Sequence, residues 1–274
     1  MLIAHITDPH LGLPPGFLPG HPGTSATLRS ALAHVRTLDP APEVLLLTGD
    51  LAEAGREADY SELNRLLDEA LGSLGDGGPR VLALAGNHDL PTVAQRVLGH
   101  RMPVASDAPD GRTCWHVSHG GLHFIGLDTV VARRPHGELR AEQLDWLART
   151  LQRCAGQPAV IGLHHPPLVT GVSAMDEYGL RQGTDELARL VAAHGQVQLI
   201  AAGHMHRAIT GVLGGAPVVV APSPSHQIDL NLRPGAPLAC RLEPPMIGLY
   251  RWVPGRGITC HFSHVERFPG PFPV

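Results

Sequence analysis

Hydrophobic runs typical of buried strands recur along the chain, at residues 2–7, 43–48, 80–85, 121–128, 159–163, 197–202 and 216–221. Between many of them lie stretches with apolar positions at helical spacing, at 24–38, 58–74, 141–154 and 184–195. Strands that alternate with helices of this length predict an α/β fold with largely parallel central strands. Residues 206–266 contain further short β-type runs and few helical signals, so we expect antiparallel strands to extend the sheet there.

Polar residues follow five of these apolar runs directly. They are Asp8 and His10 after the first run, Asp50 after the second, Asn87 to Asp89 after the third, His164 and His165 after the run at 159–163, and His204 and His206 after the run at 197–202. Because the carboxyl ends of parallel strands in an open α/β sheet line one crevice, we expect these side chains to converge.

The residue types indicate a metal site. Carboxylates, imidazoles and one amide oxygen, with no thiolate, suit ions such as Mn, Fe or Zn. The D-x-H and H-x-H spacings place two donors at one strand end, and Asp50 stands alone, as a carboxylate that bridges two ions could. The alternatives are an Asx turn at residues 87–89 that caps the next helix, and ordinary core or surface roles for single histidines. Five such junctions together favour the metal site.

Taken in order, D-x-H, G-D, G-N-H-D, H and G-H-x-H resemble the calcineurin-like metallophosphoesterase superfamily, from the first strand to about residue 266. The resemblance implies a four-layer αββα sandwich of two mixed β-sheets flanked by helices. It also implies a binuclear centre of Fe, Mn or Zn, with Asp50 bridging the two ions. One ion would be held by Asp8, His10, Asp50 and His206, and the other by Asp50, Asn87, His164 and His204.

The same resemblance implies roles around the substrate phosphate. His88 would not bind metal but would face the phosphate, and as an imidazolium it is the expected general acid for an alkoxide leaving group. Asn87 and His206 are expected to contact substrate as well. Asp89 is expected to orient an imidazole.

Three segments resemble bacterial class III cyclic-nucleotide phosphodiesterases and the related glycerophosphodiesterases. They are residues 135–147, 164–182 and 218–230. In that branch the position of His226 lies near the substrate phosphate; the alternative is a surface loop residue. For His136, His165 and Asp176 a structural role is at least as well supported as a functional one.

The sequence therefore predicts a phosphodiesterase that hydrolyses 3′,5′-cyclic nucleotides, with cAMP as the first candidate, by means of a metal-bridged hydroxide. A glycerophosphodiesterase, or a hydrolase of other small phosphodiesters, is the alternative with the same chemistry. A non-catalytic scaffold of the same fold is the alternative from another class, and the intact ligand set argues against it.

Composition limits the partners. The 274 residues predict a single domain, 1–274, in which the Pro-rich segment 233–247 is either a lid or the contact of a homodimer. The net charge of −4 argues against a nucleic-acid partner. No apolar run approaches the roughly 20 residues of a membrane span, and MLIAHITDPH lacks a basic leader, so we expect no membrane contact and a cytoplasmic location.

The four cysteines, Cys114, Cys154, Cys240 and Cys260, form no C-x-x-C pair. They are interpreted as reduced core residues, not as a disulfide framework or a zinc knuckle. Histidines outside the strand-end motifs, His116 and His123 among them, are treated as ordinary.

Overall fold

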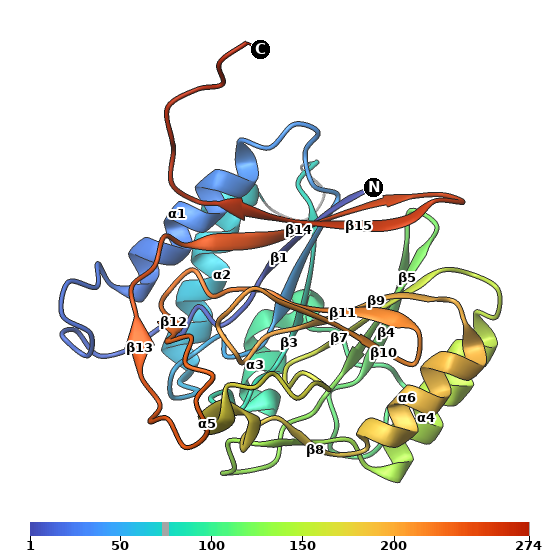
Figure 1. Cartoon of the computed structure of the whole chain (residues 1–274). Coiled ribbons are helices and arrows are strands. Elements are labelled where there is room, and N and C mark those ends of the chain that lie inside the picture. The colour runs from blue at the N-terminus through green and yellow to red at the C-terminus, as the bar shows by residue number, and fades with distance from the viewer. Residues whose placement is uncertain (73–76, 274) are drawn as a thin grey trace.

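The first of two mixed β-sheets is built around the N-terminal strand. The computed structural model describes residues 1–72 and 77–273 (Figure 1). Sheet one has the order β15 (Gly257–His264), β14 (Met246–Val253), β1 (Leu2–Ile6), β2 (Val44–Thr48) and β3 (Arg80–Leu84). β1, β2 and β3 are parallel, whereas β14 is antiparallel to both β1 and β15.

The second sheet has a parallel centre and antiparallel edges. Its order is β10 (Ile209–Leu213), β11 (Ala216–Val220), β9 (Val197–Ala202), β7 (Ala159–Leu163), β5 (Leu122–Leu127) and β4 (Trp115–His119). β11, β9, β7 and β5 run parallel, and the edge strands β10 and β4 are each antiparallel to their neighbour.

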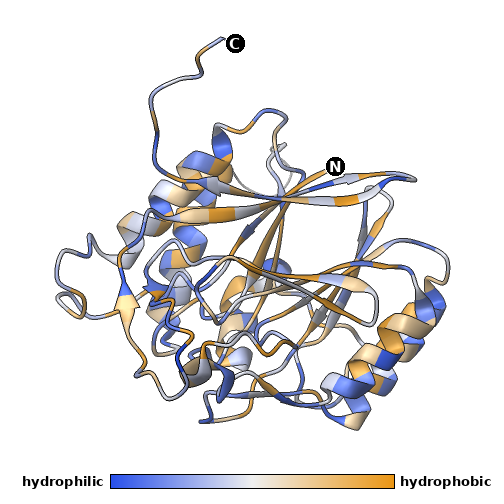
Figure 2. Cartoon of the chain, in the orientation of Figure 1, coloured by the Kyte–Doolittle hydropathy of each residue, from blue (hydrophilic) through white to orange (hydrophobic). Residues whose placement is uncertain are grey.

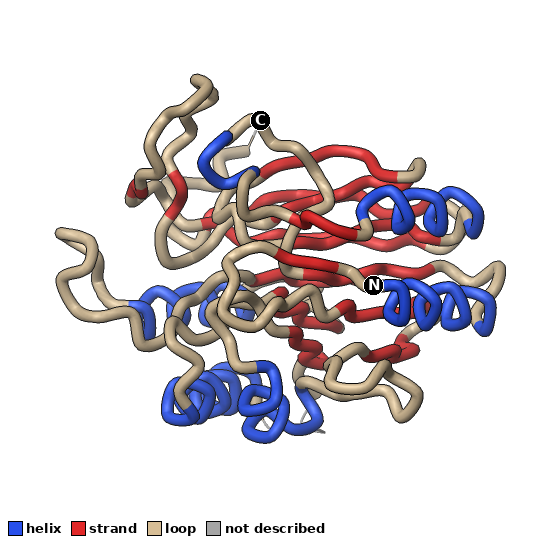
Figure 3. Tube along the Cα trace, turned by 90° about the horizontal axis from the view of Figure 1, so that it is seen from below, coloured by secondary structure: helices blue, strands red, loops and turns tan. Residues whose placement is uncertain are grey.

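Helices cover the outer face of each sheet, and the two inner faces pack on each other (Figure 3). α1 (Thr24–Arg36), α2 (Glu57–Leu71) and α3 (Pro91–Leu98) share a hydrophobic cluster with outward residues of β1 to β3. α4 (Ala141–Arg153) and α6 (Thr184–His194) do the same for the second sheet. A third cluster lies between the sheets, where Leu46 of β2 and Val160 of β7 both belong to it.

This layering explains the continuous apolar runs. A strand that is covered on both faces must be hydrophobic at successive positions, because its side chains point alternately to the two layers. In β2, Leu45 and Leu47 belong to the helix-side cluster and Val44 and Leu46 to the cluster between the sheets. Hydropathy colouring accordingly places orange along the central strands (Figure 2).

The predicted four-layer αββα fold is confirmed, and the predicted strands and helices correspond to β1, β2, β3, β5, β7, β9, β11, α1, α2, α4 and α6. Residues 73 and 74, predicted to continue the second helix, lie outside the described residues. The antiparallel strands expected in 206–266 are β10, β14 and β15. β4 and α3 have no counterpart in the sequence-based assignment. β4 is a partly exposed edge strand with His116, Ser118 and His119, so its apolar signal is weak.

The short elements lie outside the main layers. They are η1 (Gly99–Arg101), α5 (Ser173–Asp176), β6 (Gly137–Glu138), β8 (Leu180–Gln182), β12 (Gln227–Ile228) and β13 (Cys240–Arg241). β12 and β13 pair as an antiparallel ribbon that includes part of the segment 233–247, where Leu238 and Leu242 are exposed. The lid or homodimer role of this segment stays a prediction.

The cysteines are free thiols, as expected, but not all are core residues. Cys114 and Cys154 are buried, Cys260 is half-buried and Cys240 is exposed. The core assignment is wrong for Cys240 because β13 belongs to the outlying ribbon and not to either sheet. Among the described residues, none of the helices has the length and apolar character needed to cross a bilayer.

Candidate metal centre

The residues predicted as metal ligands come from both sheets and lie at the carboxyl ends of parallel strands. In the first sheet, Asp8 and His10 follow β1, Asp50 follows β2 and Asn87 follows β3. In the second, His164 follows β7, and His204 and His206 follow β9. The packing of one sheet on the other therefore brings the ends of five strands to one edge of the sandwich.

The first group of four predicted ligands is compact. The ligand atoms of Asp8, His10, Asp50 and His206 all lie within 4.8 Å of one another, and all four residues are buried. His10 Nε2 is 3.1 Å from His206 Nε2 and 3.6 Å from Asp50 Oδ2, and His206 Nε2 is 3.4 Å from Asp8 Oδ1.

Hydrogen bonds fix which nitrogen of each imidazole faces this group. His10 Nδ1 donates to the Glu53 carboxylate at 2.7 Å, and His206 Nδ1 donates to the carbonyl oxygen of His226 at 2.9 Å. Each ring therefore offers its Nε2 lone pair, and these two lone pairs face each other. Such a contact repels unless a proton or a metal ion lies between the nitrogens.

The second group of predicted ligands consists of Asp50, Asn87, His164 and His204. Here too a hydrogen bond from Nδ1 of an imidazole leaves its Nε2 facing other acceptors. His164 Nδ1 donates to the backbone oxygen of Thr48 at 2.8 Å, so its Nε2 faces two acceptors, Asn87 Oδ1 at 3.1 Å and Asp50 Oδ1 at 3.4 Å. His204 Nε2 is buried and has no hydrogen-bond partner among the described residues. An unpaired buried nitrogen is costly unless it binds something. The donor set therefore fits two cations, with one carboxylate oxygen of Asp50 toward each.

The electrostatics of both groups favour added positive charge. Burial alone would lower the pKa of His164, but the carboxylates of Asp50 and Asp8 outweigh it and raise that pKa to about 9. The pKa of His10 is raised in the same sense, because Glu53, Asp50 and Asp8 outweigh burial. In both groups the surrounding carboxylates therefore stabilise positive charge at the position where a metal ion would bind.

The other two imidazoles keep their lone pairs available. Burial lowers the pKa of His204 to about 3, with a further contribution from the neighbouring His164. Burial and the neighbouring His10 likewise lower the pKa of His206 to about 3. Both rings are therefore neutral near pH 7, as metal ligation requires.

The backbone at the site is strained. Asp8, His10, Asp50, His204 and His206 account for five of the six non-glycine residues with positive φ in the described part of the chain. Each such conformation costs about 1–3 kcal/mol and persists where surrounding contacts impose it. Here the backbone N–H of His204 donates to the Asp8 carboxylate at 3.0 Å, and that of His10 donates to the Asp50 carbonyl at 3.0 Å. The loops hold each other in this conformation.

Glycine is needed where the loops approach each other. A Cβ on Gly203 would overlap the Thr7 hydroxyl and the Asp8 carboxylate, and a Cβ on Gly86 would overlap Asp50. The glycines of G-N-H-D and G-H-x-H therefore leave space for side chains of the neighbouring strand ends.

We expect Gly203→Ala to lose bound metal and to unfold at a lower temperature, because the added methyl group displaces Asp8. Elemental analysis and calorimetry would measure both effects. Gly179→Ala is the control, since the nearest atom to a Cβ there is 3.6 Å away. Equal metal content in the two variants would show that close packing at Gly203 does not set the position of Asp8.

His88 lies beside these groups and is not part of them. Its side chain is 38 % exposed, and its Nδ1 donates to the Glu53 carbonyl oxygen at 3.0 Å. Because Nδ1 is the donor, Nε2 is the atom available to exchange a proton with a substrate. Its backbone N–H donates to Asp50 Oδ1 at 2.9 Å.

The expectation for Asp89 is wrong. Its carboxylate orients no imidazole but accepts the backbone N–H groups of Leu51, Ala52 and Gly86 and the hydroxyl of Tyr60. Asp89 therefore joins the loops after β2 and β3. The helix-capping alternative for residues 87–89 is also wrong, since α3 has Leu90 at its N-cap and no side-chain cap.

Glu53 contacts both His10 and His88 and was not identified from the sequence. Its carboxylate orients His10, its carbonyl orients His88, and it is half-buried. The available signal was its position three residues after Asp50, in the same loop.

His226 is buried beside the first group, so the surface-loop alternative is wrong. Its ring centroid lies 4.5 Å from that of His206 and 5.5 Å from that of His10. Burial and these two neighbours lower the pKa of His226 to about 2. The ring is therefore neutral, and its Nδ1 lies 3.2 Å from Ser225 Oγ.

We expect His226→Ala to retain both metal ions, since the contact with His206 uses the backbone carbonyl of residue 226. The KM for the preferred diester should rise if the ring contacts substrate. Steady-state kinetics at fixed metal loading measures this, and unchanged KM would assign the ring to packing alone.

The residues with two open interpretations have structural partners. Both nitrogens of His165 are engaged, by Thr129 Oγ1 at 2.7 Å and the Pro135 carbonyl at 3.1 Å. Asp176 accepts hydrogen bonds from Thr170 and Gly171 within its own loop. His136 lies 3.5 Å from the Glu138 carboxylate.

A four-layer sandwich with two adjoining groups of Asp, His and Asn side chains suited to metal binding at one strand edge is the arrangement expected of a metallophosphoesterase. The chain belongs to the calcineurin-like phosphoesterase family, whose model matches residues 1–208. Enzymes of this family use a dinuclear metal centre. The resemblance inferred from the motifs is thereby confirmed.

Its relatives are phosphodiesterases by name. The chain is 34% identical to a probable cyclic nucleotide phosphodiesterase of Synechococcus, covering 88% of each chain. It is 28% identical to a probable glycerophosphodiester phosphodiesterase, GpdQ, of Arcobacter nitrofigilis, covering 100% of this chain and 96% of the relative. A dimetal phosphatase from Danio rerio shares the fold with a TM-score of 0.67 at 15% identity, covering 97% and 96% of the two chains.

Proposed function

We propose that this chain hydrolyses 3′,5′-cyclic nucleotides, with cAMP as the first candidate, and that it holds two ions of Fe, Mn or Zn. The observation that supports the metal centre is the geometry of its imidazoles, whose Nε2 atoms face other acceptors in both groups. The cyclic-nucleotide substrate is supported by relatives, including a cAMP/cGMP dual specificity phosphodiesterase of Mycobacterium tuberculosis at 32% identity over 85% of this chain.

Glycerophosphodiesters are the second candidate substrates. The GpdQ relative matches the chain over its whole length, whereas the Synechococcus relative matches 88% of it. The part of the chain beyond residue 208, where the family model ends, includes His226 and the ribbon of β12 and β13. Because this region includes His226 beside the candidate metal centre, we expect it to influence which leaving group is accepted.

The protein's own residues would divide the work of hydrolysis. Two bound ions would supply Lewis-acid activation of the attacking water and of the phosphate. Asp8, His10, Asp50, Asn87, His164, His204 and His206 would hold them. The amide of Asn87 and the imidazoles of His88, His206 and His226 would position the phosphate, and His88 Nε2 would donate a proton to the leaving oxygen.

A substrate panel tests the proposal. Metal-free protein is reloaded with Mn²⁺ and assayed against cAMP, cGMP, glycerophosphodiesters and an aryl phosphomonoester. We expect the highest kcat/KM with cAMP. A preference for glycerophosphodiesters would establish the second candidate, and a preference for the monoester would overturn the phosphodiesterase assignment.

The remaining assignments follow from composition. We propose that the enzyme is cytoplasmic. We also propose that it acts on small phosphodiesters and not on nucleic acids, because a net charge of −4 disfavours binding of a polyanion.

A further inference from the structure

A separate cluster of side chains that could bind a metal lies away from the strand edge that carries the candidate metal centre. It consists of His116 from β4, His123 from β5 and Cys154 at the C-cap of α4. Their ligand atoms all lie within 4.8 Å of one another. His123 and Cys154 are buried and His116 is half-buried, so the group is closed on its inner side and open to solvent at one imidazole.

Neighbouring amides orient two of these donors. His123 Nε2 donates to Gln157 Oε1 at 2.9 Å, which leaves the Nδ1 lone pair facing His116 Nε2 at 2.8 Å. The side chain of Gln196 donates from Nε2 toward Cys154 Sγ at 3.4 Å. An N–H directed at sulfur supports a thiolate, and an imidazole whose other nitrogen donates to an oxygen is the usual arrangement of a histidine ligand.

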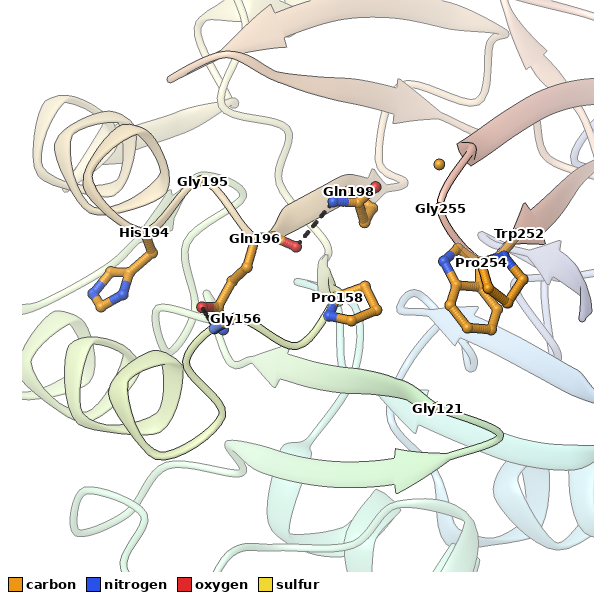
Figure 4. A pocket seen from close by; sticks show the side chains of 11 residues that line it. Gly121, Gly156, Pro158, His194, Gly195, Gln196, Gln198, Trp252, Pro254 and Gly255 are labelled. Carbon is orange, nitrogen blue, oxygen red and sulfur yellow. Dashed lines mark hydrogen bonds between the residues drawn. The ribbon is translucent and has the colours of Figure 1, made fainter.

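The orientation of Gln196 is itself fixed. Its Oε1 accepts the backbone N–H of Gly156 at 3.1 Å, and both residues line a surface depression together with Pro158 and Trp252 (Figure 4). Its Nε2 also donates to the Cys154 carbonyl at 3.0 Å. Gln196 thus contacts both the turn that follows α4 and the Cys154 sulfur.

We propose that His116, His123 and Cys154 form a third metal site, which binds Zn²⁺ with solvent as the fourth ligand. Zinc takes imidazole nitrogen at about 2.0–2.1 Å and thiolate sulfur at about 2.3 Å in tetrahedral geometry. Three donors at that range from one ion lie within about 4 Å of each other, so only small side-chain movements are needed. The site has a soft thiolate, whereas the candidate metal centre contains none.

The chemistry of binding is a proton exchange. Burial raises the pKa of the Cys154 thiol, and its hydrogen is directed to the Thr150 carbonyl at 3.2 Å. Binding replaces the S–H bond with a Zn–S bond, and the thiol proton leaves to solvent. The hydrogen that His116 Nε2 shares with His123 Nδ1 at 2.8 Å moves to His116 Nδ1, so that both facing nitrogens offer lone pairs. The positive charge of the adjacent Arg153 is balanced by Asp107, whose carboxylate lies 2.9 Å away.

A bound ion would link three elements, the strands β4 and β5 of the second sheet and the helix α4. β4 is an edge strand whose sheet neighbour is β5, and α4 covers the outer face of the same sheet. An ion held by all three would fix the edge hairpin to the helix. This site is independent of the proposed phosphodiesterase function.

Cobalt substitution tests the proposal directly. Metal-free protein is titrated with Co²⁺, which gives a sulfur-to-cobalt charge-transfer absorption in the near ultraviolet only where a thiolate is a ligand. We expect three ions per chain and this absorption. Asp50→Asn should lose ions from the candidate metal centre and keep the absorption, which separates the two sites.

Matched variants identify the ligands. Cys154→Ser should lose the absorption and one ion per chain. His116→Gln, at a half-exposed position, should weaken the site at least about tenfold, since even changes to the partners of a metal ligand cost that much. Cys240→Ser, at an exposed cysteine on β13, should keep the full absorption. Absence of the absorption in the parent protein, its survival in Cys154→Ser, or unchanged affinity in His116→Gln would each overturn the proposal.

Discussion

Asp50→Ala is expected to release at least one metal ion per chain and to reduce diesterase activity by about 10³-fold or more. The reason is that the two carboxylate oxygens of Asp50 face different groups, with Oδ2 3.6 Å from His10 Nε2 and Oδ1 3.4 Å from His164 Nε2. Loss of a single oxyanion-hole hydrogen bond costs about 10²–10³-fold, and loss of a carboxylate shared by both ions should cost at least as much. Elemental analysis and kcat/KM measure the two effects.

Asp128→Ala provides the matched control. Asp128 is also a buried carboxylate directly after a strand, β5, but it accepts from Thr113 and Val130 and is not among the predicted ligands. We expect this variant to be less stable yet to bind two ions in the candidate metal centre. If Asp50→Ala kept two ions there and turned over normally, the bridging assignment would be wrong.

His88→Ala is expected to retain both ions and to lose about 10²–10⁴-fold in rate on cAMP, the usual contribution of a positioned general acid. A ribose alkoxide needs a proton as the P–O bond breaks, whereas a nitrophenolate leaves without one. The loss on bis-nitrophenyl phosphate should therefore be much smaller under identical metal loading. The part common to both substrates reports phosphate stabilisation.

The structure sharpens this test. Because His88 Nδ1 donates to the Glu53 carbonyl, the acid must be Nε2, and the ring has room to meet a substrate since it is 38 % exposed. His100→Ala, at an exposed histidine beside the amino ends of β2 and β3, should leave both rates unchanged. Equal losses on the two substrates would leave His88 an electrostatic role and move the general acid elsewhere.

The sequence predicted the strands and the ligand candidates because both depend on local signals. Apolar runs marked the strands, the D-x-H spacing marked Asp8 and His10, and a position directly after a strand marked Asp50. The interpretation of Asp89 failed because its partners, such as Tyr60, come from another helix and another loop. Glu53 was missed for the same reason, since only the folded loops bring it to His10 and His88.

The division of the strands between two sheets could be inferred only by resemblance. An apolar run shows that both faces of a strand are covered, but it does not show whether helices or a second sheet cover them. The pairing of β14 with β1 is likewise set by packing, because no short-range pattern links Leu2 to Arg251.

That pairing has a consequence for synthesis on the ribosome. β1 lies between β2 and β14, so one of its edges stays open until residues 246–253 have been made. An apolar strand with an unpaired edge is a template for wrong pairing with other chains. Until β14 has been made, the N-terminal half of a growing chain is therefore prone to wrong strand pairing at the open edge of β1. A truncation before β14 should aggregate even though it retains every predicted metal ligand.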